Sequence, residues 1–252
     1  MLISFIIATY NAGKTLDRCL NSIVPQLSDE CELILVDGGS KDNTNEIIDS
    51  YGDKIAVHIS EPDKGIYDAW NKGVKHARGN WVGFIGADDI LLPDAVKTWI
   101  KTIKNTPDID SYDYICAHNE YADKNGNVIQ VIGEPAVWNR MRRGMVAAHV
   151  GSLHNKHNLF ETIGGYDLQF HICADYDLLL RKRNKLKSLF VDHSIARMQT
   201  GGMSFSTKAI KETYFIRKKN KSVGIITNML LFLKNYLSLK TYNIRHKSSV
   251  KL

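Results

Sequence analysis

A repeated alternation of short apolar runs with helical patterns constrains the fold more than any other feature of the chain. Four mostly apolar runs occur in the first 90 residues, at 2–8, 32–36, 55–59 and 81–85. Between them, apolar residues recur at the spacing of a helix with one buried face. Strands that alternate with helices build a mostly parallel sheet with helices on both faces. The sequence therefore predicts an α/β fold.

Two adjacent carboxylates, Asp88 and Asp89, follow the fourth apolar run. Open α/β sheets bind ligands beyond the carboxyl ends of their strands, which is where this pair is expected. Neighbouring carboxylates repel each other unless a cation or hydrogen-bond donors lie between them. A hard divalent cation that carries a diphosphate fits such a position. A structural alternative is open, because the helix predicted after Pro93 could use an aspartate as its N-cap.

The turn after the first strand nearly matches a P-loop. Residues 8–15 end in Gly-Lys-Thr between a strand and a helix, and residues 33–37 resemble the metal-binding strand of a nucleotide triphosphatase. However, the loop begins with Ala8 instead of glycine, whose access to positive φ shapes a phosphate nest. A P-loop also leaves Asp88 and Asp89 without a role. A P-loop nucleotide hydrolase is kept as an alternative.

The pattern becomes less regular after Pro93. We expect a helix over 96–103, a strand over 112–117, a hairpin over 120–132, a short basic helix or loop over 138–144, a strand over 146–154, a helical face over 159–163, a strand over 189–195 and a closing loop over 200–204. The hairpin rests on Asn125-Gly126, which favours a tight turn. His149 and His154 lie in the run 146–154, and either a structural or a catalytic role is open for them.

A second acidic pair, Asp175 and Asp177, opens an apolar helix that continues to Arg181. The positive end of a helix and its free amides stabilise a carboxylate. Helix capping explains one of the two aspartates but not both, because residues two apart point in different directions. One of them is therefore a candidate for chemistry.

The net charge of +6 comes from the C-terminal tail. Of the 33 Lys and Arg, nine lie in 217–252 with none of the 27 Asp and Glu, so residues 1–216 hold 24 basic and 27 acidic side chains. A slightly acidic body without clustered basic and aromatic motifs argues against nucleic-acid binding. The apolar run 223–233 is too short to span a bilayer. Its basic flanks suit a helix on an anionic membrane surface, or a helix packed on the body with a basic face toward solvent.

The four cysteines lie far apart and form no CxxC pair, which indicates reduced thiols. The first eight residues lack the basic lead-in of a signal peptide. We therefore expect a cytoplasmic protein, with the inner face of the cytoplasmic membrane as a peripheral location.

Five ordered motifs resemble those of the family 2 glycosyltransferases of the GT-A fold, in particular the short bacterial enzymes that build O-antigen, capsule and exopolysaccharide repeats. The resemblance runs from residue 1 to about residue 204. The motifs are IATYN at 7–11, VDGGSKDNT at 36–44, EPDKGIYDAWNKG at 61–73, GADD at 86–89 and ADYDLLLR at 174–181.

The resemblance implies a GT-A domain over 1–216, with a donor half over about 1–117 and an acceptor half over about 118–216, followed by a basic helical extension over 217–252. It also implies a nucleotide-sugar donor, UDP-sugars being favoured, and Mg²⁺ or Mn²⁺ bound by Asp88 with Asp89. Asp175 matches the catalytic base. The residues implied at the donor are Thr9 and Asp37 near the base, Asn71 near the ribose and diphosphate, and Tyr10, Asn11, Lys64, Gly65 and Asp88.

Two positions depart from the family pattern. Gly86 replaces the first acidic residue of the DxD motif, and Ala174 replaces the glutamate that often precedes the base, so Asp175 is the main candidate and Asp177 the reserve. The implied activity is inverting transfer of a hexosyl or N-acetylhexosaminyl group to a glycan or polyprenyl-diphosphate-linked saccharide in surface polysaccharide biosynthesis. The alternatives are the P-loop hydrolase and a nucleotide-sugar-binding protein without transfer activity.

Overall fold

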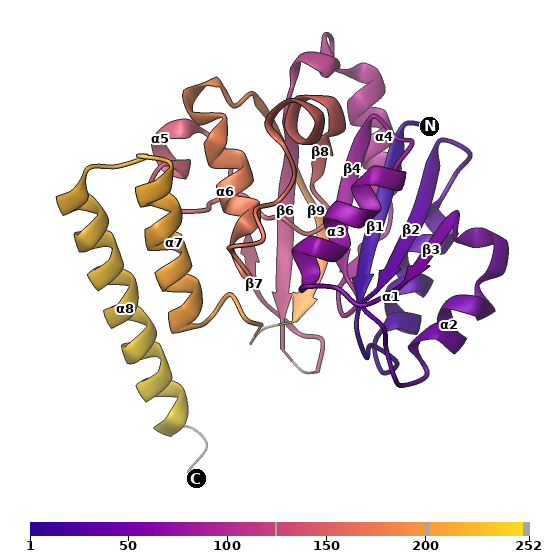
Figure 1. The fold of residues 1–252 in the computed structure, drawn as a ribbon, viewed down its shortest axis with the longest axis horizontal. Coiled ribbons are helices and arrows are strands. Elements are labelled where there is room, and N and C mark those ends of the chain that lie inside the picture. Colours follow the sequence, from indigo (N-terminus) through magenta and orange to yellow (C-terminus); the bar gives the residue numbers. More distant parts are fainter. Residues whose placement is uncertain (124, 200–201, 249–252) are drawn as a thin grey trace.

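The computed structural model describes residues 1–123, 125–199 and 202–248, with side chains through residue 241. Within these residues the strands form one mixed sheet (Figure 1). The strands are β1 (Ile3–Thr9), β2 (Cys31–Asp37), β3 (Val57–Ser60), β4 (Trp81–Gly86), β5 (Ile90–Leu91), β6 (Tyr114–Ala122), β7 (Val128–Ile132), β8 (Leu153–Asn155) and β9 (Ser188–Gln199).

Helices surround this sheet. The α-helices are α1 (Leu16–Ile23), α2 (Thr44–Ser50), α3 (Ile66–His76), α4 (Ala95–Asn105), α5 (Trp138–Met141), α6 (Ala174–Arg181), α7 (Thr207–Lys219) and α8 (Ile225–Ser248). Short 3₁₀ turns are η1 (Val24–Gln26), η2 (Gly52–Lys54), η3 (Ile109–Ser111) and η5 (Arg183–Lys185), and η4 (Lys156–Glu161) is a π-helix.

The strand order is β3-β2-β1-β4-β8-β6-β9-β5, with β7 paired to β6. The first four strands are parallel, as predicted. The rest of the sheet is mixed: β8 pairs antiparallel with β4 and β6, and β6 pairs parallel with β9 and antiparallel with β7. The predicted α/β fold with a mostly parallel central sheet is therefore confirmed. The sheet as a whole is mixed, because a hairpin and the short antiparallel strand β8 replace strand–helix repeats in its second half.

The central strands are buried on both faces, so alternate side chains enter two cores. Ile3, Phe5 and Ile7 of β1 point into a core covered by α1, α2 and α4. Ile6 of β1 and Phe84 of β4 point into the other core, which α3 and α6 cover. The helices between the parallel strands pack their apolar faces on these two cores, as the helical spacing in the sequence predicted. Because β1 to β4 run parallel, their carboxyl ends lie at one common edge of the sheet.

Several predicted elements differ in extent. The run 146–154 is a strand only over β8, because Gly151 adopts a φ of +71° and a turn joins the Ser152 amide to the His149 carbonyl. The separate strand and hairpin expected over 112–132 are the continuous strand β6 followed by β7, and the predicted turn at Asn125-Gly126 has Gly126 at a φ of +86°. The helix expected over 223–233 extends to Ser248 as α8.

The C-terminal helices α7 and α8 form an antiparallel pair at one end of the molecule, beyond α6 (Figure 1). The division expected between residues 216 and 217 falls inside α7, and Arg217 is fully buried. No helix in the described ranges is both long and apolar enough to cross a bilayer. All four cysteines are free thiols.

Candidate active site

Thr9 and Asp37 end the neighbouring strands β1 and β2, and their side chains meet there. The Thr9 hydroxyl donates to Asp37 Oδ1 over 3.2 Å. Asp37 is fully buried and also accepts from the Gly39 amide, the Ser40 amide and hydroxyl, Asn45 and Ser60. Burial alone would raise the pKa of this carboxyl, but the hydrogen bonds outweigh it and hold the pKa below its ordinary value. Asp37 is therefore an ionised anchor of the turn after β2.

The loop after β1 has its backbone amides occupied by side chains of the next loop. The donors are Asn11, Ala12 and Gly13, and the acceptors are Ser40 Oγ, Thr44 Oγ1 and Asp42 Oδ2, at 2.8, 2.8 and 3.0 Å. A P-loop needs such amides free for phosphate, and a carboxylate beside one of them repels phosphate. The near match to a P-loop therefore does not build a phosphate nest.

Asp88 and Asp89 follow β4 and have very different surroundings. Asp88 is exposed, and within the described chain its carboxylate has no hydrogen bond or ion pair. Asp89 is only 6% exposed, and its Oδ2 accepts from the Gly86 amide over 3.2 Å. Burial, and then the charge of Asp88, raise the pKa of Asp89 from 3.8 to about 8. Asp88 is thus the carboxylate available to a cation.

The packing of Asp89 explains the glycine at position 86. A Cβ atom on Gly86 would lie 2.7 Å from Asp89 Oδ2 and 3.0 Å from Asp88 Oδ1. An acidic side chain at position 86 would therefore displace both carboxylates. Position 86 departs from the DxD pattern because the Asp89 carboxylate occupies the space that a side chain there would need.

Asp89→Asn is expected to change how stability depends on pH in metal-free protein. The folded state holds the Asp89 proton up to about pH 8, whereas the unfolded chain releases it near 3.8. The wild type therefore loses stability as pH rises between these values, because the unfolded state ionises first. Asparagine removes this loss. In thermal unfolding with EDTA, the stability of the variant relative to the wild type should therefore increase from pH 5 to pH 8. Parallel curves would contradict a buried, protonated Asp89.

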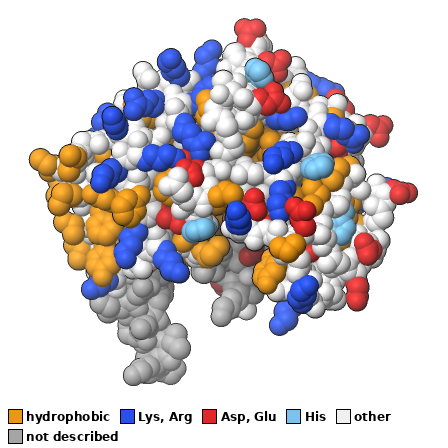
Figure 2. Space-filling view, in the orientation of Figure 1, with side chains coloured by type: hydrophobic (Ala, Val, Ile, Leu, Met, Phe, Trp, Pro, Cys, Tyr) orange, Lys and Arg blue, Asp and Glu red, His pale blue; other side chains and the backbone are white. Residues whose placement is uncertain are grey.

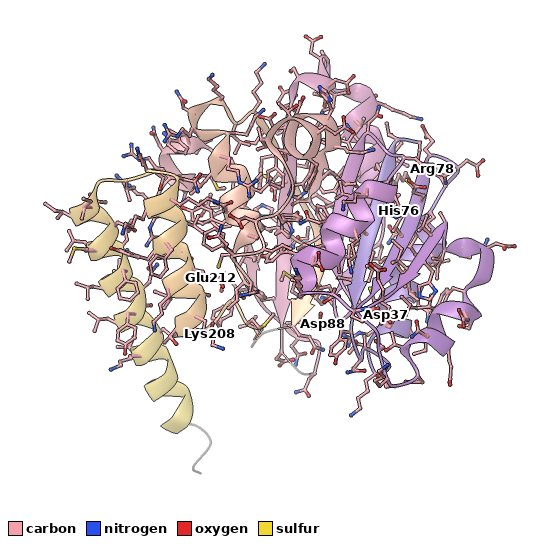
Figure 3. The ribbon with its side chains drawn as sticks, viewed as in Figure 1. Asp37, His76, Arg78, Asp88, Lys208 and Glu212 are labelled. Atoms are coloured by element: carbon pink, nitrogen blue, oxygen red, sulfur yellow. The ribbon has the colours of Figure 1, made fainter. Side chains whose placement is uncertain are left out.

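Asp175 lies in the first turn of α6 but does not cap that helix. Just before the helix, the Glu212 carboxylate of α7 (Figure 3) accepts from the amides of His171, Ile172 and Cys173 at 3.0, 2.9 and 3.0 Å. These three amides precede the first helical residue, Ala174, so Glu212 holds the segment that leads into α6 and lies near the positive end of that helix. Among the described residues the Asp175 carboxylate binds no amide of α6, so it is free for another role.

The Asp175 carboxylate has two neighbours from other elements. The Tyr67 hydroxyl lies 3.0 Å from Asp175 Oδ1 and 2.7 Å from the Ile172 carbonyl, so its single proton is shared between two acceptors. His149 Nδ1 lies 4.0 Å from Asp175 Oδ2. Asp175 thus keeps acceptor capacity for a third group.

Asp177 faces the opposite way. It is fully buried, pairs with Arg181 at 2.6 Å and Lys219 at 3.1 Å, and accepts from Asn220 at 2.8 Å. These contacts tie α6 to the end of α7. Asp177 is an ion-paired structural residue, and the reserve role as a base does not fit its position.

His149 is mostly buried among aromatic rings beside the Asp175 carboxylate. Its ring stacks on Phe84 with centroids 5.8 Å apart, and within the described chain neither ring nitrogen has a hydrogen-bond partner. Burial lowers the pKa of His149, and the charge of Asp175 opposes this only in part. A neutral imidazole therefore forms one wall of the site. His154 is fully buried on β8, where burial also lowers its pKa.

Asp175 borders two cavities. Asp88, Asp89 and Asp175 together line a cavity of about 270 Å³. A larger cavity of about 720 Å³ extends from Asp175 and His149 toward β7 and α7. The fold thus gathers three of the acidic residues singled out in the sequence around one space. Asp37 and Asp88 lie at the same end of the sheet, whereas His76 and Arg78 lie at the opposite end (Figure 3).

Three more of the predicted donor residues lie in α3 or just before it. Gly65 has a φ of +107°, a conformation that favours glycine, and its amide donates to Asp63 over 2.8 Å. The side chain of Lys64 is exposed. The Asn71 amide donates to the Tyr166 carbonyl over 3.0 Å and accepts from the Tyr166 amide over 2.9 Å. Asn71 would have to give up one of these bonds to reach a ribose.

Comparison with known proteins decides the family. The sequence model described as "Glycosyl transferase family 2" matches residues 4–163. The chain belongs to glycosyltransferase family 2. A PGL/p-HBAD biosynthesis glycosyltransferase of Mycobacterium bovis is 32% identical over 189 residues, which cover 71% of this chain and 69% of the relative.

Two solved structures support the GT-A fold of this glycosyltransferase. Residues 1–349 of S. aureus TarS, in complex with UDP-GlcNAc, match with a TM-score of 0.71 at 16% identity and cover 94% of this chain and 73% of that one. A mannosyltransferase of Pyrobaculum calidifontis, in complex with GDP-Man and Mn²⁺, matches with a TM-score of 0.67 at 16% identity and covers 98% and 74%. At this identity the likeness concerns the fold alone. Family membership and the occupied loop amides leave the P-loop hydrolase without support.

In this glycosyltransferase a divalent cation fits a site in which the substrate supplies part of the ligands. Among the described residues, no three His, Cys, Asp or Glu side chains come together as a metal cage. Mg²⁺ commonly uses one or two carboxylates and fills its other positions with substrate phosphates and water. Asp88 suits that arrangement because it is exposed at the end of β4.

Sequence reasoning missed two residues of the glycosyltransferase that contact the Asp175 region. Tyr67 lies within a motif at 61–73, but nothing in the sequence pairs it with Asp175. Glu212 lies outside all five motifs, and its three amide bonds depend on how α7 packs against α6. Residues 202–204 of the predicted closing loop line the smaller cavity, and Thr200 and Gly201 lie outside the described residues.

Glu212→Gln is expected to lower kcat of the glycosyltransferase about tenfold with little change in donor affinity. The amide lacks the charge that binds three N–H groups, so the segment before Asp175 loses its fixed position. Steady-state kinetics and donor titration check this, and Glu212→Asp is expected to recover part of kcat. Lys101→Gln, at an exposed position of α4 away from both cavities, is the control. An equal fall in donor affinity would contradict a role confined to the Asp175 side.

Proposed function

We propose that this glycosyltransferase transfers a hexosyl or N-acetylhexosaminyl group, with inversion, from a nucleotide-diphosphate donor to a hydroxyl of a saccharide acceptor. The observation that carries the proposal is that Asp175 borders both the cavity of Asp88 and the larger cavity toward α7. A donor in the first cavity and an acceptor in the second would meet at this carboxylate.

The donor would extend from the ends of β1 and β2 to the end of β4. Thr9 and Asp37 are buried and shape the nucleotide end, while the exposed ring of Tyr10 can stack on a base. Asn11, Lys64, Gly65 and Asn71 line the path toward the diphosphate in this proposal. UDP-sugars are favoured, which is supported by the UDP-GlcNAc complex of TarS.

The chemistry follows from the position of Asp175. Its carboxylate accepts the proton of the acceptor hydroxyl as the acceptor oxygen forms a bond to the anomeric carbon. The bond from that carbon to the diphosphate breaks on the opposite side, so the configuration inverts. Mg²⁺ or Mn²⁺ held by Asp88, with Asp89 behind it, would stabilise the negative charge of the leaving diphosphate.

We further propose that the acceptor is a glycan or a polyprenyl-diphosphate-linked saccharide of bacterial surface polysaccharide biosynthesis. The name of the mycobacterial relative supports a biosynthetic role. Such an acceptor is presented at the inner face of the cytoplasmic membrane, where the enzyme would act from the cytoplasm as a peripheral protein.

A product analysis tests the proposed function. The enzyme is incubated with Mn²⁺, single nucleotide sugars and lipid-linked saccharide fractions, and released nucleoside diphosphate and product are measured. We expect stoichiometric diphosphate release and, by NMR, an anomeric configuration opposite to that of the donor. A product with retained configuration would refute direct displacement assisted by Asp175.

A further inference from the structure

The side of α8 that faces solvent is apolar. Six large side chains are between 51% and 78% exposed: Ile225, Ile226, Met229, Leu230, Leu233 and Leu237. At the helical repeat they fall on one side of α8. On the other side, Asn228 donates to the Tyr214 carbonyl of α7, and the Phe232 ring packs on Tyr214 at 5.6 Å. α8 is thus packed on α7, and its solvent side carries this apolar stripe in addition to the exposed Lys234 and Lys240.

This apolar stripe is held in place and is not a loose tail. Arg217 of α7 is fully buried, and it donates to Asn228 Oδ1 over 2.7 Å and to the Arg143 carbonyl over 3.0 Å. Ser222, between the two helices, exchanges hydrogen bonds with Arg142 at 2.9 and 3.2 Å. The helix pair is thus fixed to the body with its apolar side outward. Contiguous apolar surface of this kind marks a site of interaction.

Basic side chains lie beside the stripe. Lys208, Lys211 and Lys218 are exposed and share one face of α7 with Phe215. Lys211 and Phe215 line a groove of about 560 Å³ together with Met229 and Leu233 of α8. Figure 2 shows the hydrophobic side chains gathered at this end of the molecule with Lys and Arg side chains next to them. The sequence has no Asp or Glu after Glu212. The surface therefore suits a partner that is both apolar and anionic.

We propose that these residues, which we term the α7–α8 face, bind the surface of an anionic lipid bilayer. The face consists of the six apolar side chains of α8 with Lys208, Lys211, Phe215 and Lys218 of α7. In this orientation α8 lies along the boundary between headgroups and acyl chains, and the lysines reach the phosphates. A second copy of the chain is a poor occupant, because its lysines would meet these lysines. The inference rests on the proposed function only in placing the enzyme beside a lipid-linked acceptor.

Vesicle sedimentation of the full chain tests the α7–α8 face without donor or acceptor, so its outcome is independent of transfer activity. We expect the wild type to bind phosphatidylcholine vesicles that contain phosphatidylglycerol, more weakly at high salt, and Leu230→Glu/Leu233→Glu to bind at least about tenfold more weakly. The matched control is Ile129→Glu on β7, because Ile129 and Leu230 are both 62% exposed. The control is expected to bind as the wild type does.

Two results would overturn the proposal. One is equal vesicle binding by the wild type and Leu230→Glu/Leu233→Glu, with both folded by circular dichroism. The other is a wild-type dimer in sedimentation velocity that the same substitutions dissociate, which would assign the face to a second copy. Retained transfer to a soluble acceptor by the double variant supports a docking role, since neither leucine lines the cavities of the site.

Discussion

Asp175→Asn lowers kcat of sugar transfer by about 10²- to 10⁴-fold, the usual contribution of a general base, if the proposed mechanism holds. Asparagine keeps the shape of the side chain but cannot take the acceptor proton. Donor binding is expected to persist, because Asp88 and the ends of β1 and β2 are unchanged. Initial rates at saturating donor, with donor affinity by calorimetry, check the result.

The control for this variant is Tyr67→Phe, which removes one neighbour of Asp175 Oδ1 but leaves the carboxylate. Its loss of kcat is expected to be much smaller. A loss of less than about threefold in Asp175→Asn would exclude Asp175 as the base. A wild type that binds donor but shows no turnover with any acceptor would support the nucleotide-sugar-binding alternative instead.

Asp88→Asn is expected to lower kcat/KM by about 100-fold or more and to weaken its dependence on Mn²⁺. The substitution removes the exposed carboxylate at the end of β4 without a change in size. Rates measured across a Mn²⁺ titration check this, because a lost ligand shifts the midpoint as well as the plateau.

The adjacent Asp89→Asn is the matched control for Asp88→Asn. Asp89 is buried and has a pKa of about 8, so at neutral pH asparagine resembles its protonated form. We expect its loss of kcat/KM to stay below about tenfold. Equal losses in the two variants would show that both aspartates hold the cation, as the sequence alone suggested.

The parallel half of the fold was predictable because each strand and helix there follows from local patterning. The runs 33–36 and 81–85 are apolar because both faces of their strands are covered. The mixed half was not predictable in the same way. β8 is only three residues long, and its place between β4 and β6 depends on long-range pairing that no local period records.

The candidate site was also only partly predictable from the sequence. Asp88 and Asp175 lie in recognisable motifs, so both could be identified as candidate site residues from the sequence. Which aspartate of each pair stays free is a matter of packing: Asp89 turns toward Gly86, and Asp177 pairs with Arg181. Glu212 shows the limit most clearly, because its role depends on three backbone amides that carry no sequence signal.

The exposed face of α8 was also beyond sequence reasoning. The run 223–233 and its basic flanks are visible in the sequence, but which side faces α7 depends on Asn228 and Phe232. With both turned inward, the large aliphatic side chains are left in solvent.

The most direct test of a metal-assisted nucleotide-sugar transferase is a thermal-shift panel of UDP, GDP, dTDP and ATP, each with and without Mn²⁺, on the wild type and Asp88→Asn. Ligands that bind only the folded state raise its Tm, by about 5 °C at ~100-fold excess over Kd. We predict a Mn²⁺-dependent rise with one nucleoside diphosphate, UDP being favoured, that Asp88→Asn loses. A rise with ATP alone that Asp88→Asn leaves unchanged would contradict the proposed donor site.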